Sequence, residues 1–402
     1  MNENSFSQQE FTQVVADRST SRIVNQNALV SGIFDSNGIS KSDLAKRLKL
    51  SKPAVSKNVA DLIEMGLVKE NGTGLTGKNG GRKPTMLYIN ESHRYLGALD
   101  LSFQNPFCAV GDLRCNILKA QKFKIDRNAS SEDKNRYVRL VFMQMLEELN
   151  VSAEQLGVIV ISQPGVIDDD GENLYSLTRH HAWTGIGLKQ CLMRRLNVPI
   201  IVKNDMNLSA IGEMCFGNFG HVNDLIYVSC GIGLGSGVII GGKLHEGNDR
   251  AAGALGEFLS TSGKRADDYV AIDGLLKHVN MKFAETGAQD AGREELTFSR
   301  VVELVRGGDQ IANRAVYEIG RQLGYIIYNC SVMLNIKTVV FGGEYLKFGK
   351  VIFDGIESVL AQEFPFIPEV LPSSLDDMSG IYGGFIVGKD EIFQQTILRG
   401  AV

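Results

Sequence analysis

Apolar residues recur at helical spacing in three consecutive segments near the start of the chain. The first segment is residues 21–34, and the other two begin after Ser40 and Ser51. A serine directly before a helix can accept a hydrogen bond from an unpaired first-turn amide, and a proline such as Pro53 is tolerated there. The last two segments, joined by a brief turn, predict a helix-turn-helix. The expected inward-facing residues are Ile23, Leu29, Val30, Ile33, Leu44, Leu48, Val55, Val59 and Leu62.

Two short strand patterns follow, Leu67–Lys69 and Met86–Ile89, and a glycine-rich segment from Asn71 to Gly81 joins them. This arrangement predicts a winged helix-turn-helix with a basic wing. Arginine and lysine on a wing can enter a narrow minor groove, where the electrostatic potential is most negative. Caps and apolar stripes alone would also fit a small helical bundle that binds no nucleic acid. The candidate DNA-binding residues are Ser51, Lys52, Pro53, Ser56 and Lys57 on the last helix, and Arg82 and Lys83 on the wing.

A different pattern starts after His93, where strands, turns and helices alternate, as is typical of an α/β fold. Two hairpins, at Leu96–Asp112 and Leu225–His245, open similar halves and hint at an internal duplication. Further strands are expected at Leu156–Ile161, Ile200–Lys203 and Thr338–Phe341, and helices at Glu132–Leu149, Gly187–Leu196 and Gln310–Leu334.

Charge is distributed unevenly along the 402 residues. Residues 1–90 contain 12 Lys+Arg and 8 Asp+Glu, a balance of +4; subtraction from the chain totals of 42 and 46 leaves 30 and 38, or −8, for residues 91–402. A basic front and an acidic remainder fit DNA contact at one end. No apolar run of about 18 residues and no signal peptide is recognisable, and the six cysteines are scattered, so we expect a cytoplasmic protein with reduced thiols and no membrane contact.

Candidate chemistry in the second part lies at the ends of predicted strands. The run from Ser229 to Gly237 contains four alternating glycines, whose backbone amides could cradle a phosphate. The alternative is a hairpin that needs close backbone packing. Asn204 and Asp205 follow a buried strand and could bind hydroxyl groups, and Asp205 could act as a general base. The alternative for this segment is that Asp205 or Asn207 merely caps the next helix.

These segments, taken in order, resemble the ROK family, which includes bacterial sugar-responsive repressors and sugar kinases. The resemblance runs from about Ser21 to Gly388. Its repressor branch carries an N-terminal winged helix, which LAKRLKLSKPAVSKNVADLIEMGLVKE and GGRKP resemble. The segments that resemble the family's body are VISQPGVIDDDG, VKNDMN, CGIGLGSG, LHEGNDRAAGALGEF and VVFGGEYL.

The resemblance implies a two-lobed, actin-like α/β body, the fold of sugar kinases and actin, behind the winged helix-turn-helix. It implies a sugar in the cleft, held by Asn204 and Asp205, and assembly into homodimers or homotetramers. The predicted divisions are a mobile tail at 1–20, a DNA-binding domain at 21–90, a first lobe at 94–205 completed by 378–402, and a second lobe at 206–377.

Departures from the family's kinase motifs argue against phosphoryl transfer. The family's first phosphate loop has the form Asp-x-Gly-x-Thr, whereas this chain reads Asp100-Leu101-Ser102-Phe103-Gln104. Without the glycine, the backbone cannot approach a phosphate as closely. The family's second loop contains Gly-Thr-Gly, and here Ile232 replaces the threonine. Because phosphoryl transfer depends on positioning and charge stabilisation, Asp205 alone cannot perform it. We therefore expect no enzyme activity and no cofactor, with Asp205 as a vestigial base.

The sugar loop differs as well. Where the family has Ala-Gly-Glu-x-Gly-His, Ala254 replaces the acid and Glu257 replaces the histidine. Glu257 could accept hydrogen bonds from a polyol of different stereochemistry, or it could be a solvated loop residue. Many family members carry a cysteine-rich zinc motif just beyond the histidine, but no cysteine lies between Cys230 and Cys330, so we expect no metal. His180 and His181 are more typical of a cleft wall or an exposed surface than of a metal site.

The functional hypothesis is a repressor of carbohydrate-utilisation genes whose affinity for an inverted-repeat operator changes when a carbohydrate binds the cleft. The expected ligand-binding residues are Gly165, Asn204, Asp205 and Glu257. Two alternatives remain: a sugar kinase that retains ATP-dependent phosphorylation, and a constitutive repressor with a vestigial cleft.

Overall fold

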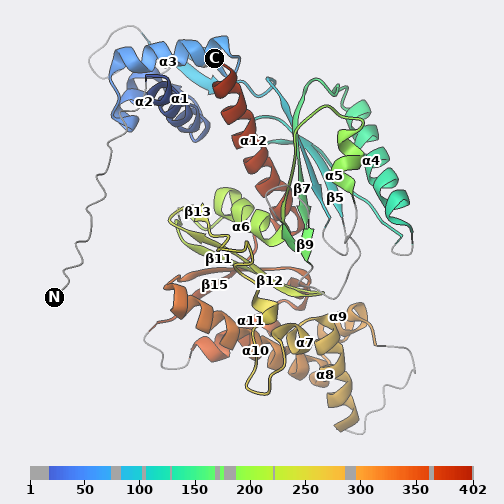
Figure 1. Cartoon of the computed structure of the whole chain (residues 1–402). Coiled ribbons are helices and arrows are strands. Elements are labelled where there is room, and N and C mark those ends of the chain that lie inside the picture. Colours follow the sequence, from blue (N-terminus) through green and yellow to red (C-terminus); the bar gives the residue numbers. More distant parts are fainter. Residues whose placement is uncertain are drawn as a thin grey trace, which may run out of the picture. The chain divides into compact units, whose positions relative to one another are not determined.

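A computed structural model of the protein describes residues 18–73, 83–101, 106–126, 129–167, 173–175, 187–220, 222–285, 296–361 and 366–400 (Figure 1). Contacts divide the chain into two compact units. The first, which we call the head, is Met1–His93 with Asp390–Val402, and the second, the body, is Arg94–Lys389.

The described residues of the head up to His93 form three helices and a three-stranded sheet of order β1-β3-β2. Ser40 caps α2 by accepting a hydrogen bond from the Asp43 amide at 3.1 Å, and Ser51 caps α3 in the same way with the Ala54 amide at 3.3 Å. The predicted winged helix-turn-helix is therefore confirmed. The elements are α1 (Arg18–Phe34), β1 (Ile39–Ser40), α2 (Lys41–Leu48), α3 (Lys52–Glu64), β2 (Val68–Thr73) and β3 (Thr85–Ile89).

Two five-stranded sheets form the body, and they have the same topology. The first has the order β10-β7-β4-β5-β6 and the second, read from its other edge, β15-β14-β11-β12-β13. In each sheet the first three strands along the chain are antiparallel and the next two pair in parallel. The hint of duplication is thus confirmed at the level of topology. The strands are β4 (Tyr95–Asp100), β5 (Phe107–Gly111), β6 (Ile117–Lys122), β7 (Leu156–Gln163), β10 (Ile200–Asn204), β11 (Leu225–Cys230), β12 (Leu234–Ile240), β13 (Lys243–Leu244), β14 (Thr338–Gly342) and β15 (Glu369–Pro372).

Each sheet carries its own apolar core. Residues of α4 and α5 pack on the first sheet, and residues of α7 to α11 pack on one face of the second (Figure 1). The other face of the second sheet packs against α6, where Ala210 contacts buried residues of β11, β12 and β14. These helices are α4 (Ser131–Glu148), α5 (Leu188–Met193), α6 (Asp205–Phe216), α7 (Ala266–Val270), α8 (Ile272–Glu285), α9 (Phe298–Arg306), α10 (Gln310–Leu334) and α11 (Lys350–Leu360); a small hairpin, β8 (Val166–Ile167) and β9 (Asn173–Tyr175), completes the first lobe.

The long C-terminal helix α12 (Ser379–Arg399) covers the opposite face of the first sheet with its first half. Gly384 and Gly388 on α12 lie next to the side chains of Ala98 and Val158. α12 also contacts α6. A Cβ atom added at Gly212 of α6 or at Gly383 of α12 would overlap the backbone of the other helix. The two helices that join the lobes therefore meet backbone to backbone. The last residues of α12, from Asp390 onward, group with the head.

Candidate functional site

The first candidate site is the outer face of α3 in the head. Val55, Val59 and Leu62 are fully buried on the inner face of this helix. The predicted contact residues Ser51, Lys52, Pro53, Ser56 and Lys57 are all exposed, and they lie at its start and on its outer face. A helix anchored on one face and polar on the other is the form in which a recognition helix enters a major groove.

The basic residues of the head fall into two groups, those that form an ion pair and those that do not. Lys41, Arg47 and Lys69 pair with Glu70, Asp35 and Glu91 at 2.8, 3.4 and 2.6 Å. Within the described ranges, no carboxylate lies within 4.0 Å of the amino groups of Lys52, Lys57 or Lys83. These three charges are therefore available to phosphates. Lys83 is exposed just before β3, the strand after the wing, and Arg82 lies outside the described residues.

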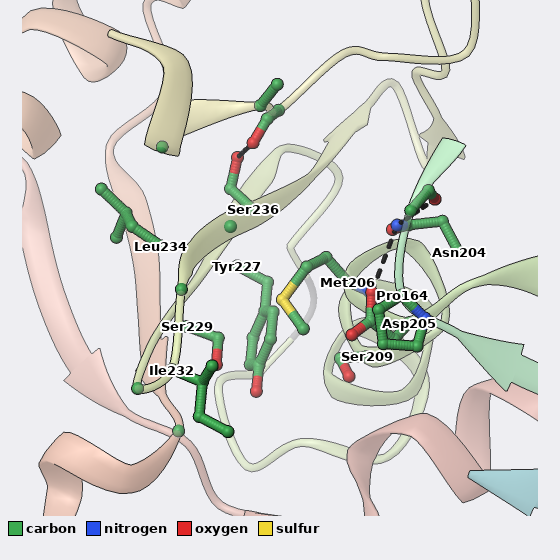
Figure 2. Close-up of a pocket in the computed structure, with 18 of the residues that line it drawn as sticks. Pro164, Asn204, Asp205, Met206, Ser209, Tyr227, Ser229, Ile232, Leu234 and Ser236 are labelled. Carbon is green, nitrogen blue, oxygen red and sulfur yellow. Dashed lines mark hydrogen bonds between the residues drawn. The ribbon is translucent and has the colours of Figure 1, made fainter. Parts of the chain in front are cut away.

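The second candidate site is a cleft of about 210 Å³ between the two lobes of the body (Figure 2). Gly165 lines it from the bend after β7, Asn204 from the end of β10, Asp205 from the start of α6, and Glu257 from the second lobe. The four predicted ligand residues, which are separated by up to 92 positions in the chain (257 − 165), therefore lie around one cavity. Sequence reasoning missed several further lining residues, among them Ser209, Tyr227, Asp267, Glu344, Asp376 and Asp377.

Asn204 and Asp205 stand where β10 passes directly into α6. The Asn204 Oδ1 atom accepts from the Asn207 amide at 3.0 Å and caps the helix, while its Nδ2 group donates to the Gly165 carbonyl oxygen at 2.9 Å. Asp205 is buried, and its Oδ1 atom accepts from the Met206 amide at 2.9 Å. Burial raises the pKa of Asp205 to about 6, and the backbone hydrogen bonds oppose that rise. The alternative that Asp205 or Asn207 caps the helix is therefore wrong, because the cap is Asn204, and Asp205 faces the cleft (Figure 2).

Glu257 lines the cleft and also forms an ion pair with Arg265, which does not line it. Arg265 donates from Nη1 to its Oε1 atom at 3.0 Å, and 38% of the Glu257 side chain is exposed. The ion pair fixes the direction of the carboxylate, and the exposed part leaves oxygen lone pairs for a ligand. Glu257 is thus partly exposed, as the solvated-loop alternative requires, and it also lines the cleft, as the ligand-binding alternative requires.

Two backbone amides of the glycine turn between β11 and β12 donate hydrogen bonds to acceptors of the chain itself. The Gly231 amide donates to the Gly233 carbonyl oxygen at 3.0 Å. The Leu234 amide donates to Oδ1 of Asp267 at 2.7 Å, and burial raises the pKa of that carboxyl. Beside the same turn, Glu344 fills the space in front of Gly231. The predicted phosphate cradle is therefore wrong at these two amides, because the chain supplies their acceptors itself.

A buried carboxylate in α6 holds the segment that forms one wall of the cleft. Glu213 is fully buried and accepts hydrogen bonds from the hydroxyls of Ser373 and Ser379, the latter at 2.7 Å. The Leu375 amide also donates to it at 3.3 Å. Because Asp376, Asp377 and Gly380 of this segment line the cleft, Glu213 positions that wall relative to α6.

The described residues contain no group of three or more side chains suited to a metal ion, and none of their helices is long and apolar enough to cross a membrane. His180 and His181 lie outside the described residues.

Comparison with known proteins places this geometry in a family. A model described as the ROK family matches residues 96–391, which is most of the chain. The chain belongs to the ROK family. A second model, described as the MarR family, matches residues 33–74 in the head. The resemblance noted from the sequence, and the actin-like fold with an N-terminal helix-turn-helix, are thereby confirmed.

Relatives of this ROK protein include both regulators and kinases. A xylose repressor of Caldicellulosiruptor bescii is 28% identical over 362 residues, which cover 84% of this chain and 88% of the relative. The crystal structure of a ROK transcriptional regulator, described as a homologue of the Escherichia coli MLC protein, has a TM-score of 0.78 at 18% identity and covers 95% of this chain and 99% of that one. A ROK glucokinase of Streptomyces griseus, solved with glucose and AMPPNP, has a TM-score of 0.62 at 21% identity and covers 73% of this chain and 98% of its own. The two structures support the fold, and only the first of them spans the head.

Proposed function

We propose that this ROK protein is a DNA-binding transcriptional regulator, a repressor of carbohydrate-utilisation genes whose operator affinity changes when a carbohydrate binds in the cleft. The observation that carries the proposal is the presence, in one chain, of an exposed recognition helix and a separate cleft lined by hydroxyl-binding groups. The similarity to a xylose repressor along 84% of the chain supports the same assignment.

In the head, Ser51, Lys52, Pro53, Ser56 and Lys57 approach base edges and phosphates of the major groove, and Arg82 and Lys83 reach the neighbouring minor groove. This assignment is supported by the exposure of the described members of the set and by the three lysines without a nearby carboxylate. The protein acts as a homodimer or homotetramer on an inverted repeat, because two recognition helices about one DNA turn apart read symmetric half-sites.

In the body, Gly165, Asn204, Asp205 and Glu257 hold the carbohydrate. Ligand binding favours one angle between the lobes, and a few kcal/mol of differential affinity suffices to shift operator binding. The protein performs this work in the cytoplasm, without a metal or a cofactor.

Phosphoryl transfer is the competing function, since the body shares its fold with a glucokinase. Two features of this chain count against it. Ile232 stands in the glycine turn where kinases of the family have threonine, and the Leu234 amide is already engaged by Asp267. A developing charge on a phosphoryl group near the Leu234 amide would therefore meet the Asp267 carboxylate instead of a free donor.

The decisive experiment measures binding of the full-length protein to duplexes from upstream of its own gene and of neighbouring operons, by fluorescence anisotropy at low and moderate salt. We expect one duplex to bind far more tightly than the rest, and a carbohydrate from a test panel to change that affinity. Failure to bind any of these duplexes, even at low salt, would refute the proposal. Incubation with ATP, Mg²⁺ and the same panel tests the kinase alternative, which sustained sugar phosphorylation would establish. Operator binding that no carbohydrate alters would favour the vestigial-cleft alternative.

A further inference from the structure

The side chains around the cleft are strongly biased toward negative charge. Among the described residues that line the cleft, seven are carboxylates and one is a guanidinium, which gives them a formal balance of −6. The carboxylates are Asp100, Asp205, Glu257, Asp267, Glu344, Asp376 and Asp377, and the guanidinium belongs to Arg250.

The cations that pair with three of these acids lie behind the wall. Arg265 pairs with Glu257 at 3.0 Å, Lys122 with Asp377 at 2.7 Å, and Lys347 with Glu344. None of the three cations lines the cleft, whereas all of their carboxylate partners do. The surface that a ligand contacts therefore carries the carboxylates of these ion pairs but not their cations.

At the glycine turn, one backbone donor that a ligand phosphate could use is already taken by a carboxylate of the chain. The Asp267 carboxylate accepts from the Leu234 amide at 2.7 Å, within the glycine turn. It also packs on Gly256, where a Cβ atom would approach the Asp267 Oδ1 atom to 2.6 Å. A phosphate at this turn would lose the Leu234 donor and would meet like charges from Asp267 and Glu344.

Other residues of the cleft wall suit a hydroxyl-bearing ligand. Asp205 and Glu257 offer carboxylate oxygens, which accept hydrogen bonds from vicinal hydroxyls or an amine, and Asn204 holds Asp205 in place by donating to its Oδ1 atom at 3.2 Å. Neither an uncharged sugar nor an amino sugar is repelled by the acidic wall, and an ammonium group is attracted by it.

We infer that the cleft selects an unphosphorylated polyol, neutral or amino-bearing, and rejects its phosphate ester and nucleotides, with Asp267 serving as a built-in substitute for a phosphate at the glycine turn. This inference deepens the proposed function and rests on its ligand-sensing part. It names Asp267 and Glu344 as specificity-determining residues.

The test measures ligand binding by thermal shift and titration calorimetry on the full-length protein without DNA. The probes are xylose, glucose, glucosamine and N-acetylglucosamine, then glucose 6-phosphate and N-acetylglucosamine 6-phosphate, and ATP with Mg²⁺. We expect at least one unphosphorylated sugar to raise the melting temperature, because a ligand that binds only the folded state stabilises it. Its phosphate ester should bind at least about tenfold more weakly, and ATP with Mg²⁺ should give no shift.

The variant Asp267→Asn removes the charge but keeps an acceptor for the Leu234 amide. It should reduce the discrimination against the phosphate ester by about threefold or more, while the matched control Asp273→Asn, which is exposed on α8 and not on the cleft wall, should leave it unchanged. Glu344→Gln tests the same charge effect at the other side of the turn if Asp267→Asn does not fold.

An ester that binds as tightly as its parent sugar would overturn the inference, and so would binding of ATP with Mg²⁺ or silence from every sugar. Equal effects of Asp267→Asn and Asp273→Asn would remove Asp267 from the selective role. Operator binding is measured in a separate assay, so a failure of ligand selection is distinguishable from a failure of DNA recognition.

Discussion

The two candidate sites of this ROK protein are built in opposite ways. On α3, the candidate DNA-binding side chains point to solvent, and Val55, Val59 and Leu62 hold the helix from the other side. In the cleft, by contrast, Asp100 and Asp205 are themselves buried polar groups that the protein keeps at a cost.

A substitution on the outer face of α3 should therefore change binding without changing stability, whereas a substitution of a buried carboxylate in the cleft should change both. An exposed lysine can be removed without disturbing the fold, so its loss affects affinity alone. A buried carboxylate that awaits a ligand reduces the stability of the empty protein, so its loss should weaken binding and strengthen the fold together. Four substitutions, taken from the largest expected effect to the smallest, test this contrast.

The backbone contact between α6 and α12 supports the cleft, and Gly383→Ala should disrupt it. The added methyl would overlap the Leu208 carbonyl oxygen, which cannot move without shifting α6. We expect a loss of about 4 kcal/mol or more in the free energy of unfolding, measured with urea. The control is Gly384→Ala in the same helix, where the nearest atom would lie at an ordinary 3.4 Å; it should be neutral or slightly stabilising. Equal losses for the two variants would contradict the close contact.

Asp205→Asn should stabilise the empty protein at neutral pH while weakening ligand binding. Because the folded-state pKa of Asp205 is raised from 3.8 to about 6, protonation stabilises the fold. This stabilisation is complete below about pH 3.8 and is lost as the pH rises through about 6. The difference of about two pKa units corresponds to roughly 3 kcal/mol at pH 7.5. Urea unfolding at pH 7.5 and 4.5 checks the sign: the advantage of the variant should shrink at the lower pH, and a variant less stable at pH 7.5 would refute the explanation.

Lys57→Ala is the corresponding test in the head. If Lys57 contacts a base edge, operator binding should weaken by about 1–3 kcal/mol while the melting temperature stays the same. Lys277→Ala, which removes an exposed lysine from α8 of the body, is the control and should change neither quantity. Unchanged operator affinity in Lys57→Ala would remove this residue from the contact surface.

Ser51 is the exception that limits the contrast, because it is exposed and also caps α3. Ser51→Ala should therefore cost about 1 kcal/mol of stability by leaving the Ala54 amide without its acceptor. Ser56→Ala on the same helix removes a hydroxyl that caps nothing and should leave the melting temperature within about one degree of the wild type. Identical melting temperatures for the two variants would show that the Ser51 cap contributes little.

Local signals explain what could be predicted from the sequence. The caps Ser40 and Ser51 act within three residues, and the amphipathic repeat of α10 predicted its bounds, Gln310–Leu334. Strand β1 escaped prediction because it is two residues long and pairs Ile39 with Leu87, a partner distant in sequence. The bounds of α12 were not predicted either, since glycines interrupt its apolar repeat for the sake of close packing.

In the candidate cleft, too, local signals could be recognised in the sequence and long-range contacts could not. Asn204 and Asp205 were recognisable because they stand at a strand end, and Glu257 because the family pattern changes there. The role of Asp267 was missed, since its hydrogen bond to the Leu234 amide spans 33 residues. The glycine turn looked like an anion site because its amides are countable in the sequence, whereas their partners are decided by the tertiary fold.

The contact between Gly212 and Gly383 also limits how α6 and α12 can move. The main chains already touch at this point, so the two helices cannot come closer. Side chains beside it link the same helices, since Phe216 packs on Tyr382 with ring centroids 4.8 Å apart and Glu213 accepts a hydrogen bond from Ser379 at 2.7 Å. A change in the angle between the lobes would therefore have to keep the glycine contact and shift these side chains.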